Sequence, residues 1–349
     1  MFKMPPKYKI VSLFSGCGGT DLGFVGGFEY LGKKYKKNNF EVIWANDIDE
    51  GGCMTYEKNL GHSIQCADIR SVLNDKTLFG NSLPDKTDIV LGGFPCQDFS
   101  LSGKRRGFDS ERGLLYKSMA EVIKRTEPLI FVAENVKGLL SIHNGEAIDI
   151  IKEDFAKLGY HVSVQLYHAA HFGIPQSRER VIMVGTNKEK GLPEFIHKPP
   201  IRKESEWVTL KNAIGDLENI EEGAIANHYW SKAKMFVGTQ GNAIVNPDKI
   251  GPTMRAEHHG NIEWHWNKKR RLSAREAARI QSFPDNFIFY PSTSGAYKQI
   301  GNAVAPVMAW HIASELEKFL KTWLTKQDGN PRKPLRDSSR SRKNPAKVA

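Results

Sequence analysis

A cysteine and a carboxyl group stand where two predicted buried strands end. Cys96 belongs to the tetrapeptide at residues 94–97, directly after the apolar run 88–93, and Glu134 follows the apolar run 129–133. Open α/β sheets keep their active sites at strand ends of this kind. A thiol can attack a substrate covalently, and a neighbouring carboxyl group can deliver or hold a proton. The pair therefore predicts an enzyme that works through a covalent intermediate.

Seven predicted strands must position these two side chains. They occupy residues 9–14, 41–46, 63–67, 88–93, 129–133, 161–167 and 180–185. Helical patterns at 114–125 and 145–158 separate several of them, and a further helix is expected from Pro306 to about residue 323. Strands that alternate with helices are typical of a doubly wound, mostly parallel α/β sheet. The loop before the last strand is too short for a helical crossover, so that strand is expected to run antiparallel.

An antiparallel last strand would complete the site. It would begin at the edge where its parallel neighbours end, and so carry residues 175–180 toward Cys96 and Glu134. Arg178 and Arg180 lie in this segment. Positive charge there could favour the thiolate and hold a carbonyl group of the substrate.

Glycines and carboxylates at the first three strand ends predict an adenosine-containing cofactor. Residues 14–19 are rich in glycine, which lets the chain turn tightly and lets a ligand approach the backbone. Asp47 closes the second strand, where a carboxylate can bind the two hydroxyls of a ribose. Asp68 and Ile69 close the third and could hold an adenine ring. The glycine spacing is not a clean G-x-G-x-x-G, and these residues alone leave NAD open.

The Cys96–Glu134 pair favours methyl transfer over hydride transfer. Hydride transfer needs no cysteine nucleophile coupled to a glutamate, whereas methylation of an unreactive ring carbon does. Carbon 5 of cytosine is such an atom. A thiolate that adds to carbon 6 turns the ring into an enamine, and carbon 5 can then attack a methylsulfonium. Glu134 could hold the proton at nitrogen 3 during this addition, and Arg178 or Arg180 could hold the base carbonyl.

Six motifs occur along the chain in one order. They lie at residues 14–19, 93–100, 134–136, 176–180, 271–284 and 301–304. With this set, the chain resembles DNA (cytosine-5) methyltransferases of the bacterial restriction–modification type. The resemblance implies a seven-stranded S-adenosylmethionine-dependent methyltransferase sheet with an antiparallel last strand, plus a smaller, irregular target-recognition domain. It also implies a sequence-specific methylase that protects host DNA from a partner restriction endonuclease acting on the same site.

The resemblance assigns roles to particular residues. Cys96 would be the nucleophile and Glu134 the base-binding acid. Arg178 and Arg180 would flank the pocket, with Arg180 the better candidate for contacting the base. S-adenosylmethionine would be surrounded by Phe14, Gly16, Gly18, Gly19, Asp47, Ile48, Asp68, Ile69, Pro95, Leu115 and Asn302. DNA would be contacted by Gln97, Ser100, Lys104, Arg105, Arg106, Arg112, Thr253 and Arg255.

Two residues depart from the family pattern. Thr20 stands where many members carry an aromatic side chain that stacks on adenine, which puts that contact in doubt. Ala305 stands where proline is common, and we expect little effect from this change.

The composition favours a cytoplasmic protein with a polyanionic partner. The net charge of +11 favours nucleic acid, and no stretch approaches the roughly 20 apolar residues that a membrane helix needs. The four cysteines form no C-x-x-C pair, which argues against a zinc site, and scattered single thiols fit a reducing compartment. We therefore expect a monomer that acts on double-stranded DNA without a metal.

Changes in composition and in hydrophobic periodicity along the chain predict four parts. Residues 1–186 would form the catalytic and cofactor-binding domain, 187–270 the target-recognition domain, and 271–326 a segment that returns to the catalytic domain. Residues 327–349 are predicted to be a disordered basic tail. A capping box at residues 273–276 predicts a helix start in the returning segment.

The segment at residues 102–107 predicts a loop that closes on DNA. Two glycines there bracket three cations, as expected of a mobile loop that contacts phosphates. Carbon 6 is unreachable in a stacked duplex, so the target cytosine must swing out of the helix.

Two other functions stay open on the sequence. One is a transfer RNA methylase built on the same motifs, and the other is a non-catalytic DNA-binding protein that keeps the fold. The long segment 187–269 favours DNA over transfer RNA. The intact set of Cys96, Glu134 and Arg180 argues against a protein without activity.

Overall fold

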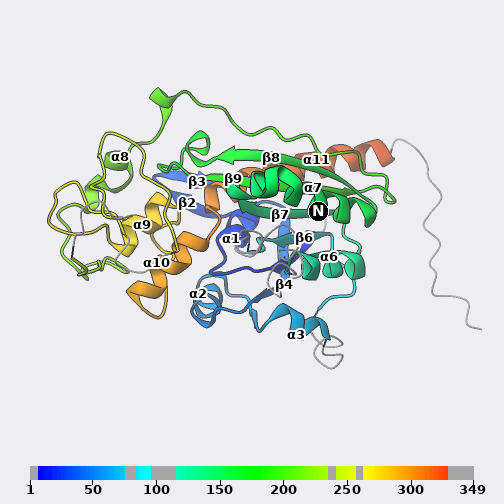
Figure 1. The fold of residues 1–349 in the computed structure, drawn as a ribbon, viewed down its shortest axis with the longest axis horizontal. Helices are drawn as coiled ribbons and strands as arrows, with labels where there is room; N and C mark the ends of the chain where they lie inside the picture. Colours follow the sequence, from blue (N-terminus) through cyan, green and yellow to red (C-terminus); the bar gives the residue numbers. More distant parts are fainter. Residues whose placement is uncertain (1–6, 75–82, 96–114, 235–240, 257–261, 329–349) are drawn as a thin grey trace, which may run out of the picture.

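A seven-stranded mixed sheet forms the centre of the molecule (Figure 1). The computed structural model describes residues 7–74, 83–95, 115–234, 241–256 and 262–328. The strands of the sheet are β1 (Tyr8–Leu13), β4 (Phe40–Asp47), β5 (Gln65–Cys66), β6 (Ile89–Gly92), β7 (Ile130–Val136), β8 (Tyr160–His168) and β9 (Glu179–Asn187). Their order across the sheet is β5-β4-β1-β6-β7-β9-β8, so the chain reverses direction across the sheet between β1 and β6. Such a switch point opens a crevice at the carboxyl ends of the strands.

The last strand, β9, confirms the expected antiparallel orientation. The strands from β5 to β7 in this order pair in parallel, whereas β9 lies antiparallel between β7 and β8. Its register sets Arg180 opposite Val136 and Ile182 opposite Glu134. The start of β9 therefore lies beside the end of β7, as the sequence predicted.

Helices cover both faces of the sheet, which explains why its central strands β6, β7 and β9 are largely apolar runs. One face packs against α1 (Gly19–Val25) and α11 (Pro306–Asp328). The other packs against α3 (Ile69–Asn74), α6 (Leu115–Thr126) and α7 (Glu146–Lys157). In addition, α2 (Glu50–Leu60) packs Cys53 and Tyr56 on Ala45 of β4. The predicted α/β class is confirmed.

Helices α1 and α11 approach each other closely at a glycine. A Cβ atom on Gly23 would lie 2.4 Å from Ala309 Cβ and 2.5 Å from the Pro306 carbonyl oxygen. Only a residue without a side chain leaves room for the backbone of α11 at this distance. The C-terminal helix is thereby docked on the N-terminal part of the chain.

Two features of the catalytic half were not predicted. A short hairpin, β2 (Phe28–Tyr30) and β3 (Lys33–Tyr35), follows α1, and α2 follows β4. The C-terminal helix also runs to Asp328, past the expected end near residue 323. Single-turn 3-10 helices complete the description: η1 (Lys137–Leu140), η2 (Ile142–Gly145), η3 (Ala169–Phe172), η4 (Glu204–Glu206) and η5 (Gly215–Leu217).

A second lobe, the described residues between 204 and 303, lies to the left of the sheet in Figure 1. It contains α8 (Leu210–Ile214), α9 (Ala274–Ile280) and α10 (Thr293–Asn302), joined by long irregular segments. Its core includes a cluster of Phe283, Phe287 and Phe289, and it extends to Cys17 and Leu22 of the catalytic half. The weak periodicity of this part of the sequence reflects the scarcity of regular elements in it.

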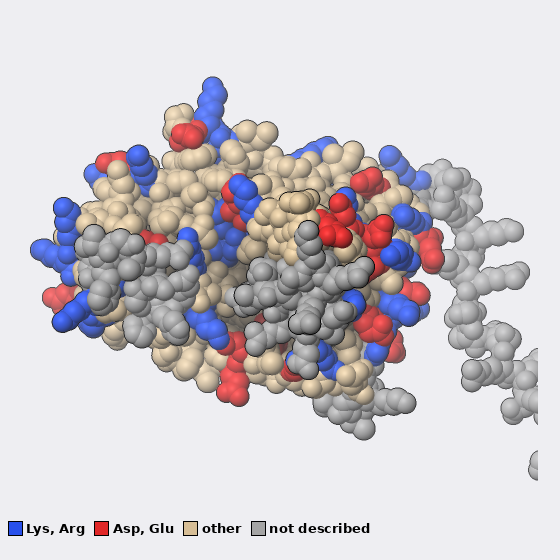
Figure 2. All heavy atoms as spheres, viewed as in Figure 1, with Lys and Arg blue, Asp and Glu red and all other residues tan. Residues whose placement is uncertain are grey.

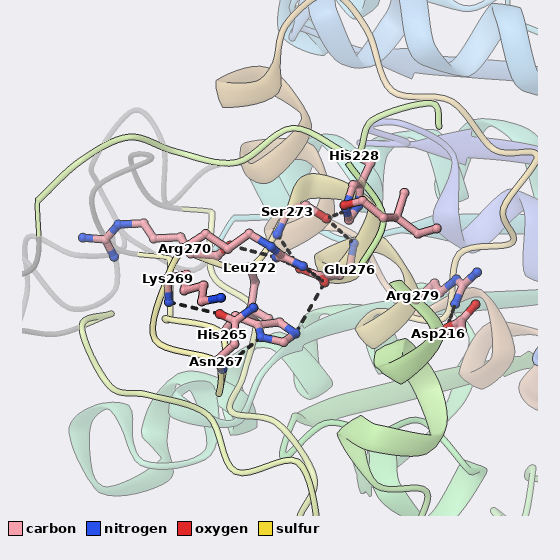
Figure 3. Close-up of polar contacts among 12 residues, drawn as sticks. Asp216, His228, His265, Asn267, Lys269, Arg270, Leu272, Ser273, Glu276 and Arg279 are labelled. Atoms are coloured by element: carbon pink, nitrogen blue, oxygen red, sulfur yellow. Dashed lines mark hydrogen bonds and ion pairs between the residues drawn. The ribbon is translucent and has the colours of Figure 1, made fainter. Parts of the chain in front are cut away.

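A buried polar network holds the start of α9 (Figure 3). Ser273 and Glu276 form the predicted capping box, which is confirmed. Arg270 donates to both oxygens of Glu276 at 2.7 Å, and His228 Nδ1 lies 3.0 Å from Ser273 Oγ. His265 Nε2 lies 3.7 Å from Glu276, and burial lowers the pKa of this histidine. His265 is therefore part of the buried network at the start of α9.

None of the described helices is long and apolar enough to cross a membrane. Within the described ranges, no group of three or more His, Cys, Asp or Glu side chains is arranged to hold a metal ion.

Candidate active site

The loop that carries the predicted nucleophile is anchored at its base. Asn135 donates from Nδ2 to the Phe94 carbonyl oxygen at 3.0 Å, and both residues are buried. The chain then reaches Pro95, which is exposed. Cys96 itself lies outside the described residues, as do the predicted DNA contacts Gln97, Ser100, Lys104, Arg105, Arg106 and Arg112. Asn135 was not predicted as a site residue, although its place directly after Glu134, in the motif at residues 134–136, was a signal.

Glu134 and Arg180 meet as an ion pair. Arg180 Nε lies 2.7 Å from Glu134 Oε1, and the two side chains are only 11% and 16% exposed. Burial lowers the pKa of Arg180, and the adjacent Glu134 opposes that change. A Cβ atom on Gly93 would lie 3.1 Å from Glu134 Oε2, so the glycine before Phe94 leaves space for the carboxylate. The residues come from three separate strand ends, β6, β7 and β9.

Arg178 lies in a different environment from Arg180. It is 1% exposed and does not line the cavity described below. Its guanidinium donates to the carbonyl oxygens of Met254 (2.8 Å), Gly301 (2.9 Å) and Ala303 (2.9 Å). These acceptors are all backbone atoms, so the arginine links segments of the chain, and the prediction that it flanks the pocket does not fit this position.

A cavity of about 690 Å³ opens at the carboxyl edge of the sheet beside the Glu134–Arg180 pair. Its volume is in the range of pockets that hold a cofactor. The predicted cofactor residues that line it are Phe14, Gly16, Gly19, Asp47, Ile48, Asp68, Ile69, Pro95, Leu115 and Asn302. Gly18 is the exception: a Cβ there would lie 2.5 Å from Leu60 Cδ1, so this glycine faces α2.

The glycine-rich turn after β1 is held open by Asp47. Phe14 has φ +54° and Gly16 also has φ +54°, a left-handed conformation that is costly for phenylalanine. Asp47 Oδ2 accepts a hydrogen bond from the Gly16 backbone N–H at 2.7 Å, and its Oδ1 accepts one from Asp49 at 2.8 Å. Burial raises the pKa of Asp47, and these backbone donors oppose the shift. The carboxylate is thus oriented at the cavity before a ligand arrives.

The third strand end also presents a fixed carboxylate. Arg70 Nη2 lies 2.6 Å from Asp68 Oδ2, and the Arg70 hydrogen bond lowers the pKa of Asp68. Asp68 therefore remains an anion beside the buried, apolar Ile69. An acceptor next to an apolar surface is the arrangement that an adenine ring requires.

Two observations test whether an adenosine-containing cofactor fits. A Cβ added at Gly16 would meet nothing within 4 Å, so the turn faces open space in the cavity. Gln299, which is 5% exposed and lines the cavity, has a buried Oε1 without a hydrogen-bond partner among the described residues. An unsatisfied buried acceptor is costly unless a ligand supplies a donor. The residues therefore fit such a cofactor.

Several residues of the cavity were missed by the sequence analysis. Lys298 and Gln299 both lie on α10, and Lys298 forms an ion pair with Asp49, the N-cap residue of α2. No short motif revealed the role of these residues. Of the two predicted DNA contacts in the second lobe, Arg255 is exposed and Thr253 is partly buried, with its hydroxyl donating to the Ser177 carbonyl oxygen.

Comparison with known proteins identifies the class. The model of the family described as C-5 cytosine-specific DNA methylase matches residues 8–250 and 229–318. A Type II methyltransferase of Neisseria gonorrhoeae, M.NgoFVII, is 38% identical over 341 residues, which cover 89% of this chain and 86% of that protein. M.FnuDI of Fusobacterium nucleatum is 36% identical over 348 residues, covering 89% and 95%.

Solved structures agree on the fold. A protein described as a DNA modification methyltransferase encoded within an E. coli prophage superposes with a TM-score of 0.68 at 25% identity, covering 90% of this chain and 100% of that one. The S. pombe Dnmt2 methyltransferase superposes with a TM-score of 0.63 at 18% identity, covering 89% and 99%.

The fold and the site define a methyltransferase of nucleic-acid bases. The chain belongs to the C-5 cytosine-specific DNA methylase family, and it is a DNA (cytosine-5) methyltransferase. This confirms the resemblance drawn from the six motifs. Of the functions left open on the sequence, DNA cytosine methylation is the one supported.

Proposed function

We propose that Cys96 is the nucleophile, Glu134 the acid and Arg180 the base-contacting cation of a sequence-specific methylase of double-stranded DNA. The observation that carries the proposal is the Glu134–Arg180 ion pair, which opens into the same cavity as Asp47 and the Gly16 turn. Chemistry on the base and binding of the cofactor would then share one space.

The two buried cysteines among the three described ones support Cys96 by contrast. Burial raises the pKa of Cys17 to about 12 and also raises that of Cys53, so neither gives a thiolate readily at neutral pH. Cys96 directly follows exposed Pro95 at the mouth of the cavity. Arg180 would favour its thiolate through positive charge.

Each proton and bond has an assigned group. The Cys96 sulfur would bond to carbon 6 of cytosine while Glu134, through the oxygen that Arg180 does not engage, holds a proton at nitrogen 3. Arg180 would hold the base carbonyl. Carbon 5, made nucleophilic, would take the methyl group and leave S-adenosylhomocysteine. A solvent water would then remove the carbon 5 proton, so that the bond from carbon 6 to the Cys96 sulfur breaks. S-adenosylmethionine supplies the methyl group as an electrophilic sulfonium substituent.

The cavity residues divide the cofactor between them. We assign its ribose to Asp47, its adenine to Ile48, Asp68 and Ile69, and its methionine end to the Gly16 turn and Asn302. Thr20 lines the cavity without an aromatic ring, so adenine would rely on the apolar side chains.

We assign DNA reading to the second lobe, with residues 187–270 as the target-recognition domain and 271–326 as the return to the catalytic domain, residues 1–186. In Figure 2, acidic and basic side chains are mixed on the sheet side of the visible face, and Lys and Arg prevail on the side of the second lobe. That distribution suits a duplex lying against the second lobe. The enzyme would act as a cytoplasmic monomer, and its methylation would protect DNA from a restriction endonuclease of the same specificity.

Two measurements test the proposal, one on DNA from expressing cells and one on the protein itself. Bisulfite sequencing of DNA from cells that express the chain should show 5-methylcytosine within one short sequence. A duplex with 5-fluorocytosine at that position should become covalently attached to Cys96 in the presence of S-adenosylmethionine. Fluorine replaces the carbon 5 proton whose removal would release the enzyme, so the covalent bond should persist. Attachment to another residue, or methylation without attachment, would refute the nucleophile assignment.

A further inference from the structure

Arg178 joins the two segments that flank the cavity from the second lobe. Residues 251–256, here called the strip, contribute Met254, whose carbonyl oxygen accepts from Nη1 at 2.8 Å. Residues 301–303 are the last two residues of α10 and its C-cap, and are here called the α10 loop. They contribute the Gly301 and Ala303 carbonyl oxygens, which accept from Nη2 at 2.9 Å each. One guanidinium therefore fixes the separation of the strip and the α10 loop.

A second connection runs through two buried glutamines. Gln176 Oε1 accepts from the Met254 N–H at 2.9 Å, and its Nε2 lies 2.5 Å from Gln281 Oε1. Gln281 Nε2 in turn donates to the Ala303 carbonyl oxygen at 2.5 Å. Both glutamines are 0% exposed. The strip and the α10 loop are thus tied together at two points by side chains that water does not reach.

The strip and the α10 loop also touch directly. A Cβ atom on Gly301 would lie 2.1 Å from the Arg255 carbonyl carbon and 2.2 Å from the Ala256 nitrogen. Ala256 and Asn302 both line the cavity. A displacement of the strip by even a few tenths of an ångström therefore acts on the loop that carries Asn302.

We propose that Arg178 is a positioning residue that couples DNA binding at the strip to cofactor binding at Asn302. The inference rests on the proposed function, in which Arg255 and Thr253 of the strip contact DNA and Asn302 contacts S-adenosylmethionine. Binding of either ligand favours one arrangement of the strip and the α10 loop, and that arrangement favours the other ligand. The coupling is reciprocal, as any binding linkage must be.

The chemistry of arginine suits this task. Its planar fork presents two terminal nitrogens to two segments at once, whereas a lysine offers a single nitrogen that cannot reach the same three acceptors in that geometry. Arg178 Nε is buried and has no hydrogen-bond partner among the described residues, so the side chain keeps its position at a cost. This cost is explained by the proposal, because the position of Arg178 would hold the strip and the α10 loop in the arrangement that binds both ligands.

The test compares Arg178→Lys with Arg275→Lys as a matched control. Arg275 is also 1% exposed and donates to the backbone oxygens of Ala226, Pro284 and Phe287, but it does not line or link the cavity segments. Calorimetry would give the Kd of S-adenosylhomocysteine for each full-length protein, alone and with a duplex carrying the site found by bisulfite sequencing. The ratio of the two Kd values is the coupling.

We expect a ratio for the parent of roughly 5–150, the usual range for coupled sites. Arg178→Lys should bring the ratio most of the way toward 1, and Arg275→Lys should keep the parent value even if the two substitutions lower Tm equally. A parent ratio of 1, an unchanged ratio in Arg178→Lys, or an equal loss in Arg275→Lys would overturn the proposal.

Gln281→Met covers the case in which Arg178→Lys does not fold. It removes the second connection while leaving the buried charge in place, and it should lower the ratio part of the way. A parent-like ratio in Gln281→Met would then count against the coupling. If the parent itself does not methylate duplex DNA, the proposed function fails, which is a separate result from any change in the ratio.

Discussion

Arg180 sets the orientation of the Glu134 carboxylate before a substrate arrives. The ion pair engages Oε1 at 2.7 Å, and Gly93 leaves space at Oε2. A buried pair of this kind is costly to break from one side, because the remaining charge loses its partner. Substitutions that keep the shape of Glu134 therefore report on chemistry more cleanly than truncations.

Glu134→Gln should slow methyl transfer and leave DNA binding nearly unchanged. The amide keeps the size of the side chain but cannot exchange a proton with the base, and a positioned acid contributes typically about 10²–10⁴-fold to a rate. Single-turnover transfer of radiolabelled methyl groups would measure the loss. Glu153→Gln, on an exposed part of α7, is the control and should match the parent. Equal rates for Glu134→Gln and the parent would remove Glu134 from the mechanism.

The sequence could predict the Glu134–Arg180 meeting but not the separate position of Arg178. Arg178 and Arg180 are two residues apart, so a strand through both would turn them to one face. The strand begins only at Glu179, and Arg178 in the preceding segment turns away from the cavity. Its acceptors lie 76 to 125 residues further along the chain, a relation that no local pattern contains.

At the scale of elements, the docking of α11 on α1 depends on Gly23. Gly23→Ala should destabilise the fold by about 1–3 kcal/mol, because the added methyl group meets the backbone of α11, which cannot move aside cheaply. Thermal unfolding would measure the drop in Tm. Gly215→Ala is the matched control: its φ is −63°, and the nearest atom to a Cβ is Lys211 Cγ at 3.5 Å. If both variants melt alike, the contact at Gly23 is not tight.

The central strands β6, β7 and β9 were predictable because burial on both faces makes them largely apolar runs. The β2–β3 hairpin was not, because its three-residue strands alternate buried aromatics with Glu29, Lys33 and Lys34. The buried Arg271 was unforeseen for another reason. It donates to backbone oxygens of Ala233, Lys234, Gly241 and Ile262, and such long-range polar contacts leave no periodic signal.

At the scale of the whole molecule, acid should destabilise the fold through buried histidines. Burial lowers the pKa of His168, His197, His228 and His265, and that of His311 to about 4. In the unfolded chain a histidine has a pKa of about 6.5. The folded state therefore binds fewer protons between these values, and stability is lost as pH falls from about 6.5 toward 4.

His311→Gln isolates the largest of these shifts. The neutral side chain should remove up to about 2 kcal/mol of the stability lost between pH 7 and pH 5, at about 1.4 kcal/mol per pH unit below pH 6.5. Urea unfolding at pH 7 and at pH 5 would measure the difference. A parent and a variant that lose the same stability on acidification would contradict the assignment.

The docking of the last helix also determines when the chain can finish folding during its synthesis. The sheet is complete once Asn187 has been synthesised, but the apolar face that α11 covers stays bare until residues as late as Leu320 have left the ribosome. At about 5–20 residues per second, that interval lasts roughly 7 to 27 seconds. A nascent chain would expose Ile10, Leu91 and Val132 throughout it, so truncated products that stop before Pro306 should depend on chaperones and aggregate without them.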